Sequence, residues 1–221
     1  MLLPKQMITR RTFVKGVSLA MGIAAVPGVA GCSGETTHRE ASMDMKFSEL
    51  IEARRSVRKY AKAEISRDEM AKIVEEALNA PSWKNTETTR YYAAIRDDAK
   101  AKIWSEALPG FNAASSENAA ALVAVSFVPG ESGYMGDAPA DELGEMWGAY
   151  DCGLASSYFI LAAKNHGWDT LIMGIRDTAK VKSILGIPEK EVLMSVIAVG
   201  RSAQPYFKNP RKPVDEALKT A

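Results

Sequence analysis

The chain has 221 residues, of which 47% are hydrophobic and 25% charged, so it has an ordinary globular composition and is long enough for one sizeable core. The formal net charge of +1 hides an asymmetry: residues 1–31 carry no acid, and the remainder has 24 basic against 27 acidic residues. Such a mildly acidic body lacks the strongly basic face of DNA- and RNA-binding proteins, which excludes nucleic acid as the expected partner.

The first 31 residues have the pattern of an export signal. A basic stretch is followed by an apolar run over 17–30, which is shorter than the roughly 20 residues that a membrane-spanning helix needs. Arg10-Arg11 lies in a segment that resembles a twin-arginine signal, and Val29-Ala30-Gly31-Cys32 resembles a lipobox. We therefore expect a signal peptide over 1–31, a lipid on Cys32 that attaches the chain to a membrane, and an extracytoplasmic location.

Residues 32–44 are polar and without periodicity, which is typical of a flexible tether, and the folded domain is expected over 45–221. Cys152 is the only other cysteine, so lipidation of Cys32 leaves no intramolecular disulfide. Because Cys152 lies in an apolar stretch, it is expected to be a buried small hydrophobe rather than a catalytic thiol. The two histidines lie far apart in the sequence, so no metal site is expected.

Two helices are expected before the first strand. Apolar residues at helical spacing from Phe47 predict a short helix that leads into a basic stretch. Ser66 followed three residues later by Glu69 forms a capping box, which predicts a second helix to about Asn79. Ala80-Pro81-Ser82 ends it, and a polar loop then leads to a β-prone segment over 90–95.

The rest of the chain mixes helices and strands. A continuous apolar run over 120–128 predicts a buried central strand, and the Gly- and Pro-rich segment 129–139 predicts a loop. Residues 141–166 predict a long helix that is apolar around much of its surface, so a partner subunit is expected to help bury it. Further helices are expected over 97–108 and 178–185, a short strand or turn over 171–175, and a strand over 192–199. A three-layer or α+β sandwich with a central sheet fits this order better than a bundle.

Three arginines and a serine lie within five residues: Arg54, Arg55, Ser56 and Arg58. Their forked donors and hydroxyl suit a phosphate group, although a solvated basic patch has the same composition. Residues 47–60, FSELIEARRSVRKY, resemble the opening motif of the nitroreductase family, which binds the phosphate and ribityl chain of FMN. The resemblance implies that role for these four residues.

Three later segments resemble the same family in its own order. Residues 80–87, APSWKNTE, are similar to the loop whose asparagine hydrogen-bonds the flavin, with glutamate at a position that is commonly glutamine. Residues 171–175, LIMGI, are similar to the segment whose backbone N–H faces flavin N5, and 208–213, KNPRKP, to the C-terminal motif whose arginine reaches the phosphate. Alone, each segment is also compatible with an ordinary turn or a basic tail. The resemblance implies cofactor contacts at Pro81, Ser82, Asn85, Glu87, Met173, Gly174 and Arg211. Trp83 and Lys84 lie beside the proposed flavin loop and are candidates for contact with the acceptor, although a tryptophan and a lysine in an exposed loop need have no specific role.

The ordered set of matches spans residues 47–213 and implies a common fold and chemistry. The implied fold is α+β, a nitroreductase-like three-layer sandwich whose mainly antiparallel sheet is flanked by helices, in an entwined homodimer with FMN at the interface. The implied activity is ping-pong hydride transfer through flavin N5 to a nitroaromatic, a quinone or a similar small acceptor. NAD(P)H is one candidate donor, and the exported location adds a membrane quinol or an extracytoplasmic carrier. A dehalogenating or flavin-modifying enzyme of the same fold, and a non-catalytic surface lipoprotein, are the alternatives.

Overall fold

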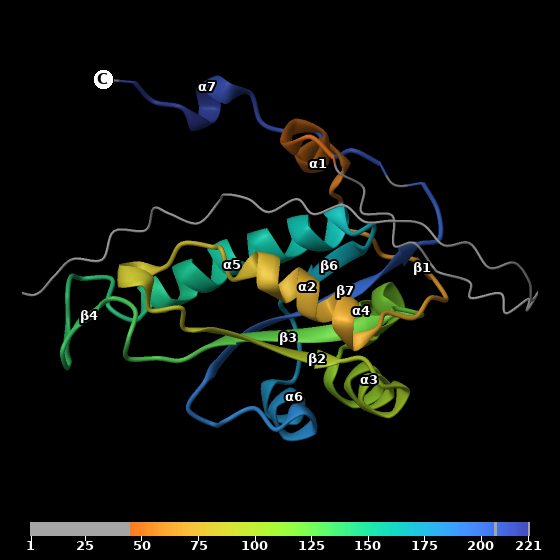
Figure 1. The fold of residues 1–221 in the computed structure, drawn as a ribbon, viewed down its shortest axis with the longest axis horizontal. Coiled ribbons are helices and arrows are strands. Elements are labelled where there is room, and N and C mark those ends of the chain that lie inside the picture. Colours follow the sequence, from red (N-terminus) through yellow and green to blue (C-terminus); the bar gives the residue numbers. More distant parts are fainter. Residues whose placement is uncertain (1–44, 206, 221) are drawn as a thin grey trace, which may run out of the picture. The chain divides into compact units, whose positions relative to one another are not determined.

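The computed structural model describes residues 45–205 and 207–220, and the predicted signal peptide, tether and lipidated Cys32 lie outside them. The centre of the domain is an antiparallel sheet (Figure 1). The strand β6 (Asp169–Met173) pairs with β7 (Val192–Ser202) on the side opposite β3 (Ala121–Phe127), so β7 lies in the middle of the sheet. Apart from β6, the strands lie in the order β1 (Tyr60–Ala61), β7, β3 and β2 (Thr89–Ala94).

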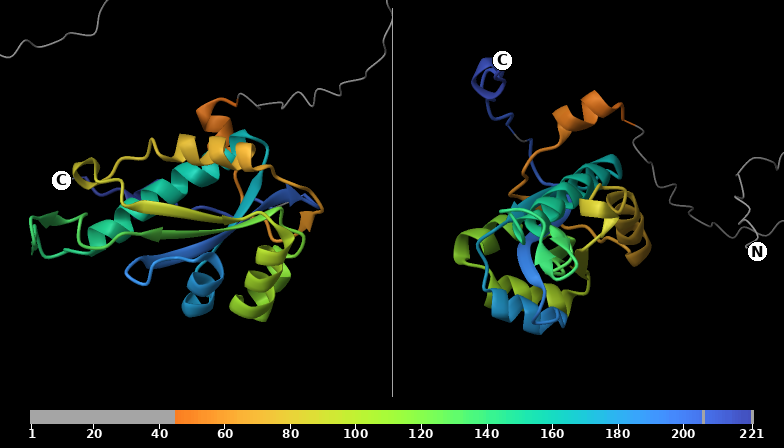
Figure 2. Two further views of the ribbon diagram at one scale, coloured as in Figure 1. Left: turned by 60° about the horizontal axis from the view of Figure 1, so that its bottom comes forward. Right: turned by 90° about the vertical axis from the view of Figure 1, so that its left-hand side faces the viewer.

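Helices cover both faces of this sheet, which gives three layers (Figures 1 and 2). The upper face in Figure 1 carries α2 (Arg67–Ala77) and α5 (Met146–Asn165), and the lower face carries α3 (Asp97–Lys102) and α6 (Thr178–Leu185). The apolar side chains between the sheet and these two sets of helices form an upper core and a lower core. All residues of β3 are buried, and alternate ones belong to the two cores. A strand covered on both faces needs a continuous apolar sequence, which is the pattern observed. The predicted α+β sandwich with a mainly antiparallel sheet is confirmed.

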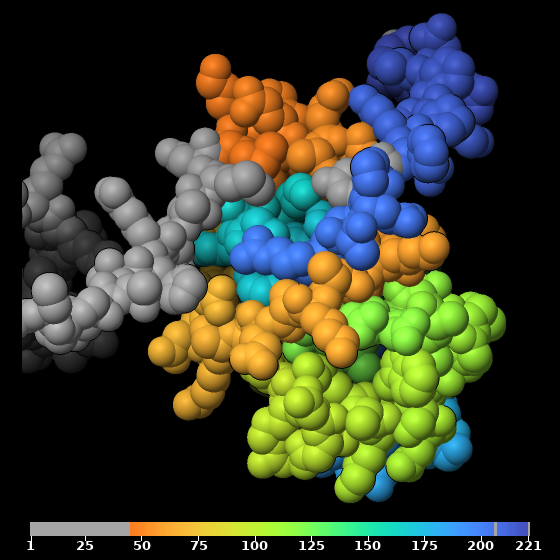
Figure 3. All heavy atoms as spheres, turned by 90° about the vertical axis from the view of Figure 1, so that its right-hand side faces the viewer, coloured from red at the N-terminus to blue at the C-terminus, as the bar shows by residue number. Residues whose placement is uncertain are grey.

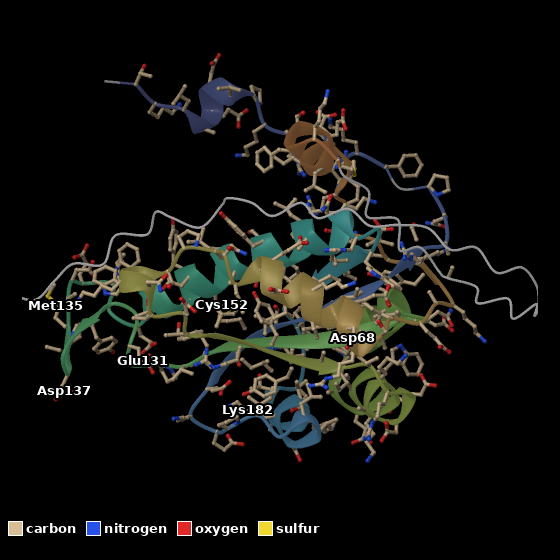
Figure 4. The ribbon with its side chains drawn as sticks, in the orientation of Figure 1. Asp68, Glu131, Met135, Asp137, Cys152 and Lys182 are labelled. Atoms are coloured by element: carbon tan, nitrogen blue, oxygen red, sulfur yellow. The ribbon has the colours of Figure 1, made fainter. Side chains whose placement is uncertain are left out.

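Local sequence explains how the helices on the upper face begin and pack. The predicted capping box is formed: the Glu69 N–H donates to Ser66 Oγ at 3.1 Å, and the Ser66 N–H donates to the Glu69 carboxylate at 2.8 Å. In α5, Gly148 faces β3, where a Cβ would lie only 2.6 Å from the Phe127 ring. Small residues on this side of α5 therefore let the helix lie close to the sheet. The buried side chain of Cys152 lies between α5 and the sheet (Figure 4).

The long helix is shorter than predicted. It begins at Met146 rather than Asp141, because the Asp141 carboxylate accepts hydrogen bonds from the Leu143 N–H at 3.0 Å and from the Trp147 indole at 2.9 Å, which stabilises a turn. The segment expected as a plain loop before it holds a small hairpin, β4 (Tyr134–Met135) and β5 (Ala138–Pro139). Figure 4 shows Met135 and Asp137 at the outer end of this hairpin.

Three other elements differ from the prediction: two on the lower face of the sheet and one in the sheet itself. The predicted helix over 97–108 changes after α3 into a π-helical turn, η2 (Ile103–Ala107), in which the Leu108 N–H donates to the Ile103 carbonyl at 3.2 Å. A helix that was not predicted, α4 (Gly110–Ser116), follows directly. The last strand continues to Ser202 rather than ending at Val199.

The elements near the two ends of the described chain bury none of their own residues. They are α1 (Phe47–Ala53) and α7 (Val214–Ala217). Phe47 is 71% exposed and Phe207 is 92% exposed, which is unusual for large apolar side chains. Within 45–205 and 207–220, no helix has both the length and the apolar character needed to cross a membrane.

Candidate functional site

The predicted arginine segment lies along the edge of the sheet. After α1 the chain becomes extended, and the Val57 N–H donates to the Thr170 carbonyl of β6 at 3.0 Å. Ser56 and Thr170 form a parallel bridge, the only parallel pairing in the described part of the sheet. This pairing fixes the segment against β6, so the arginine side chains project from a rigid edge.

The C-terminal segment joins the arginines in one cavity of about 420 Å³. Figure 3 shows the segment that follows α1 in orange and the C-terminal segment in blue on the same face of the domain. Five of the residues that the sequence predicted for the site line this cavity: Arg54, Arg55, Ser56, Arg58 and Arg211. The structure therefore brings together residues that lie about 150 positions apart in the sequence.

The cavity holds a concentration of positive charge without a matching acid. Its lining contains Arg54, Arg55, Arg58, Lys59 and Arg211 but no carboxylate. Within the described residues none of these four arginines forms an ion pair. Burial, followed by the charges of Arg211 and Arg55, lowers the pKa of Arg54. Repulsion of this kind is relieved by an anion, so the cavity suits a phosphate group.

The strand β6 leads from this cavity to the second predicted part of the site. Thr170 lies beside Ser56, and Gly174 follows four residues later, about 13 Å along an extended strand. Gly174 is exposed, and a Cβ there would meet no protein atom within 4 Å. Met173 is only 2% exposed and its side chain belongs to the lower core, so only its backbone can face a ligand.

Two residues that the sequence analysis missed hold the segment after Gly174. Asn112 of the unpredicted α4 donates from its amide to the Ile175 carbonyl at 2.8 Å. Arg176 donates to the carbonyls of Gly174 and Leu193. The position of Arg176 directly after the LIMGI segment was a usable signal, whereas nothing local in the sequence marks Asn112 as a neighbour of Ile175.

The predicted loop after α2 forms a second group with an unusual backbone. The short 3-10 helix η1 (Trp83–Asn85) and the residue Glu87 include three non-glycine residues in the left-handed region, with φ of 47° at Lys84, 58° at Asn85 and 50° at Glu87. The Glu87 N–H donates to Ser82 Oγ at 3.0 Å, and the Asn85 amide donates to the Glu87 carboxylate at 2.7 Å. A backbone held in sparsely populated conformations is a common feature of binding sites.

The loop is fixed to the start of α5 and to the β4–β5 hairpin. The buried Asp151 carboxylate accepts hydrogen bonds from the Trp83 N–H at 2.9 Å and from the Ser132 hydroxyl. The Trp83 and Trp147 rings lie 4.8 Å apart, and Lys84 Nζ donates to the Tyr134 carbonyl at 3.4 Å. Trp83 and Lys84 thus lie beside an aromatic surface, which suits contact with a flat organic molecule.

The two groups of predicted residues do not meet within one chain. The loop contacts α5 at Asp151, whereas the arginine segment lies near Leu161, about 15 Å further along the helix. The loop also leads into β2 at one edge of the sheet, whereas β6 lies near the other, about 14 Å away across three strand spacings. Pro81, Ser82, Asn85 and Glu87 therefore form one half of the predicted site, and the arginines with Gly174 form the other.

In the described part of the chain, neither the cysteine nor the potential metal ligands form an alternative site. Cys152 is fully buried, and burial raises the pKa of its thiol to about 11, as expected for an unreactive cysteine. Among residues 45–205 and 207–220, no group of three or more His, Cys, Asp or Glu side chains is placed to hold a metal ion.

Comparison with known proteins identifies a family for the chain. The nitroreductase family model matches residues 51–201, more than half of the chain. A Bacillus subtilis protein named as an NAD(P)H nitroreductase, YdgI, is 28% identical over 199 residues, which is 76% of this chain and 94% of that protein. An Archaeoglobus fulgidus protein named as an NADH dehydrogenase/NAD(P)H nitroreductase is 32% identical over 155 residues, which is 68% of this chain and 82% of that protein. The structure of an Exiguobacterium sibiricum nitroreductase-like protein in complex with FMN superimposes with a TM-score of 0.71 at 24% identity, over 80% of this chain and 98% of that one.

Proposed function

The chain belongs to the nitroreductase family, and from this premise we propose that it is an FMN-dependent oxidoreductase whose two half-sites are completed in a homodimer. The observation that carries the proposal is the cavity of uncompensated arginines at one end of β6, with open backbone at the other end. FMN has a phosphate, an extended ribityl chain and a flat ring in the same order. The FMN of the related structure supports the same choice of ligand.

The separation of the two half-sites supports the proposed homodimer. We do not expect a flavin ring at Gly174 to contact the loop over 81–87 of the same chain, because that loop packs against the start of α5 and leads into β2, across the sheet from β6. A second copy can supply its loop instead. Large apolar side chains are left exposed on α1, on α5 and in the C-terminal segment, as expected for surfaces that another chain covers: Phe47, Met146, Tyr150 and Phe207.

Each part of the chain would then have one task. Arg54, Arg55, Arg58 and Arg211 bind the phosphate, and Ser56 adds a hydroxyl donor. The backbone after Met173 faces the reactive edge of the ring, and the partner's copy of the 81–87 loop covers the ring. Bound FMN supplies the hydride chemistry, so no catalytic acid, base or nucleophile is required from the protein.

The donor and acceptor are proposed from different observations. NAD(P)H as donor rests on the names of the two relatives. A flat nitroaromatic or quinone as acceptor rests on the aromatic surface of Trp83, Trp147 and Tyr150, whose successive rings lie 4.8 and 5.6 Å apart. The lipobox at Cys32 is the basis for an extracytoplasmic, membrane-attached enzyme, in which a membrane quinol is the competing donor.

The first experiment is the visible absorption spectrum of the purified full chain, with the released cofactor identified and counted per chain. Near-stoichiometric FMN and turnover with either NADH or a soluble quinol would support the oxidoreductase. Sedimentation with and without FMN tests the homodimer in the same preparation. A protein that stays colourless after incubation with FMN would overturn the enzyme assignment and favour a non-catalytic surface lipoprotein.

A further inference from the structure

Arg176 carries a charge that the described protein does not neutralise. Its guanidinium donates to two backbone carbonyls, those of Gly174 and Leu193. Its Nε is buried without a hydrogen-bond partner, and no carboxylate within residues 45–205 and 207–220 forms an ion pair with it. Burial lowers its pKa, but a guanidinium stays protonated in proteins. A fixed positive charge therefore lies directly behind the end of β6.

The same contacts orient the backbone beyond β6. The Gly174 carbonyl is bound by Arg176 and the Ile175 carbonyl by Asn112, at 2.8 Å for the latter. The N–H groups of Gly174, Ile175 and Arg176 donate no hydrogen bond to any described residue. The Asp177 N–H, in contrast, donates to the Ala107 carbonyl of η2 at 2.7 Å, which fixes the far end of the segment. The carbonyls are thus held by the protein while the preceding donors remain available.

A backbone N–H group becomes a stronger donor when the carbonyl of the same peptide unit already accepts a hydrogen bond, because hydrogen bonds in a chain strengthen one another. The Gly174 carbonyl and the Ile175 N–H belong to the same peptide unit, so the charge of Arg176 acts on that N–H through a single amide. Gly174 and Ile175 are both exposed, with Ile175 at 65%. A ligand can therefore approach this part of the chain from solvent.

We propose that Arg176 is a positioning residue that raises the reduction potential of the bound flavin, by fixing the 174–176 backbone and by placing its uncompensated charge behind it. The inference rests on the proposed FMN function. Hydride transfer from a nicotinamide donor delivers two electrons and one proton, so the neutral ring gains one negative charge. A cation and polarised donors at the ring edge stabilise that charge without stabilising the oxidised ring equally.

The test uses the full-length, FMN-loaded protein and the substitution Arg176→Gln, which removes the charge and keeps one amide donor. We expect reduced FMN to lose about tenfold more affinity than oxidised FMN, which for a two-electron couple lowers the potential by about 30 mV. Equilibration with a redox dye measures the potential, and titration of FMN under oxidising and reducing conditions measures the two affinities.

The matched control is Arg201→Gln. Arg201 also donates to a backbone carbonyl, that of Gly167, and lies over the Trp168 ring, but it belongs to the other end of the β6–β7 pair. Its substitution should leave the potential unchanged. A shift in both variants of equal size, or an unchanged potential in FMN-loaded Arg176→Gln, would overturn the role of Arg176.

A second variant, Arg176→Lys, separates charge from geometry and keeps the test decisive where the glutamine variant fails to fold. It retains the charge but loses the fork that reaches two carbonyls. We expect a two- to fivefold loss of the preference for reduced FMN, which is smaller than for Arg176→Gln. A loss as large as that of glutamine, or no loss at all, contradicts the proposal. Failure of the wild-type protein to bind FMN would instead refute the proposed function, so the two failures are distinguishable.

Discussion

Replacing Arg211 by glutamine should weaken the binding of FMN and leave the binding of riboflavin, which lacks the phosphate, almost unchanged. Arg211 reaches the cavity from the C-terminal segment and carries one of its four uncompensated arginine charges. A hydrogen bond to a charged group contributes about 1.5–3 kcal/mol. Because Arg211 is exposed to solvent, the lower end of this range applies, and we expect about a tenfold increase in the dissociation constant of FMN.

The same substitution is not expected to destabilise the protein without cofactor. The charge of Arg211 lowers the pKa of Arg54, which shows that the two guanidinium groups repel each other. Removing one should therefore leave the thermal stability of the cofactor-free protein unchanged or slightly higher, while FMN binding falls. A loss of both properties would indicate a structural defect instead of a lost phosphate contact.

The matched control for Arg211 is its neighbour Lys212. The ammonium group of Lys212 lies 3.5 Å from the Glu216 carboxylate, and the side chain is 82% exposed and does not line the cavity. Titration followed by flavin fluorescence should show wild-type affinity for both ligands in Lys212→Gln. Equal weakening of FMN and riboflavin in Arg211→Gln, or equal weakening of FMN in both variants, would refute the phosphate assignment of this cavity.

Three further predictions concern the framework of the site. Gly148→Ala should lower the free energy of unfolding by about 1–3 kcal/mol in urea, because the new methyl group overlaps a core ring, whereas Gly153→Ala in the same helix has open space and should not be destabilising. Burial raises the pKa of the Cys152 thiol from 9.0 to about 11, so the thiol loses its proton at lower pH in the unfolded state, and the stability of the wild-type protein should fall between pH 9 and 11. The fall should be smaller in Cys152→Ala, and equal pH profiles of the two proteins would contradict the burial of a protonated thiol. Asp151→Asn removes the charged acceptor that fixes the loop after α2, and should increase proteolysis of that loop, whereas Asp137→Asn at the exposed hairpin should behave as wild type.

The elements that could be predicted are those whose sequence pattern is also their physical cause. The capping box at Ser66 starts α2 through contacts between neighbours in the sequence, and the apolar run of β3 reflects burial on both faces. The elements that were missed depend on distant contacts. The helix α4 is short and rich in Ala and Ser, and its role becomes visible only through the bond from Asn112 to Ile175, which lies 63 positions away. Asp141 looks like a helix start in the sequence, but its side chain stabilises a turn.

The candidate site shows the same division. The resemblance to the nitroreductase motifs indicated which residues along the chain bind the cofactor. The structure brings two of them, Arg54 and Arg211, into one cavity, as that resemblance implies. Sequence order, however, contains no distance, so it could not show that the loop at Asn85 lies at the opposite edge of the sheet from Gly174. The role expected of Met173 is also narrowed to its backbone, because its side chain belongs to the lower core.

Two unfavourable features of the isolated chain are relieved by two different binding partners that act on the same segment. The arginine cavity concentrates positive charge without an acid, and α1 and the C-terminal segment leave large apolar side chains in water, of which Phe207 belongs to the wall of that same cavity. An anion relieves the first feature and a second subunit relieves the second. Because both act on the C-terminal segment, the binding of either one is expected to favour the binding of the other, and such coupling is reciprocal by thermodynamic necessity. In the proposed dimer, FMN and the partner subunit should therefore strengthen each other's binding, so the cofactor stabilises the assembly as well as supplying its chemistry.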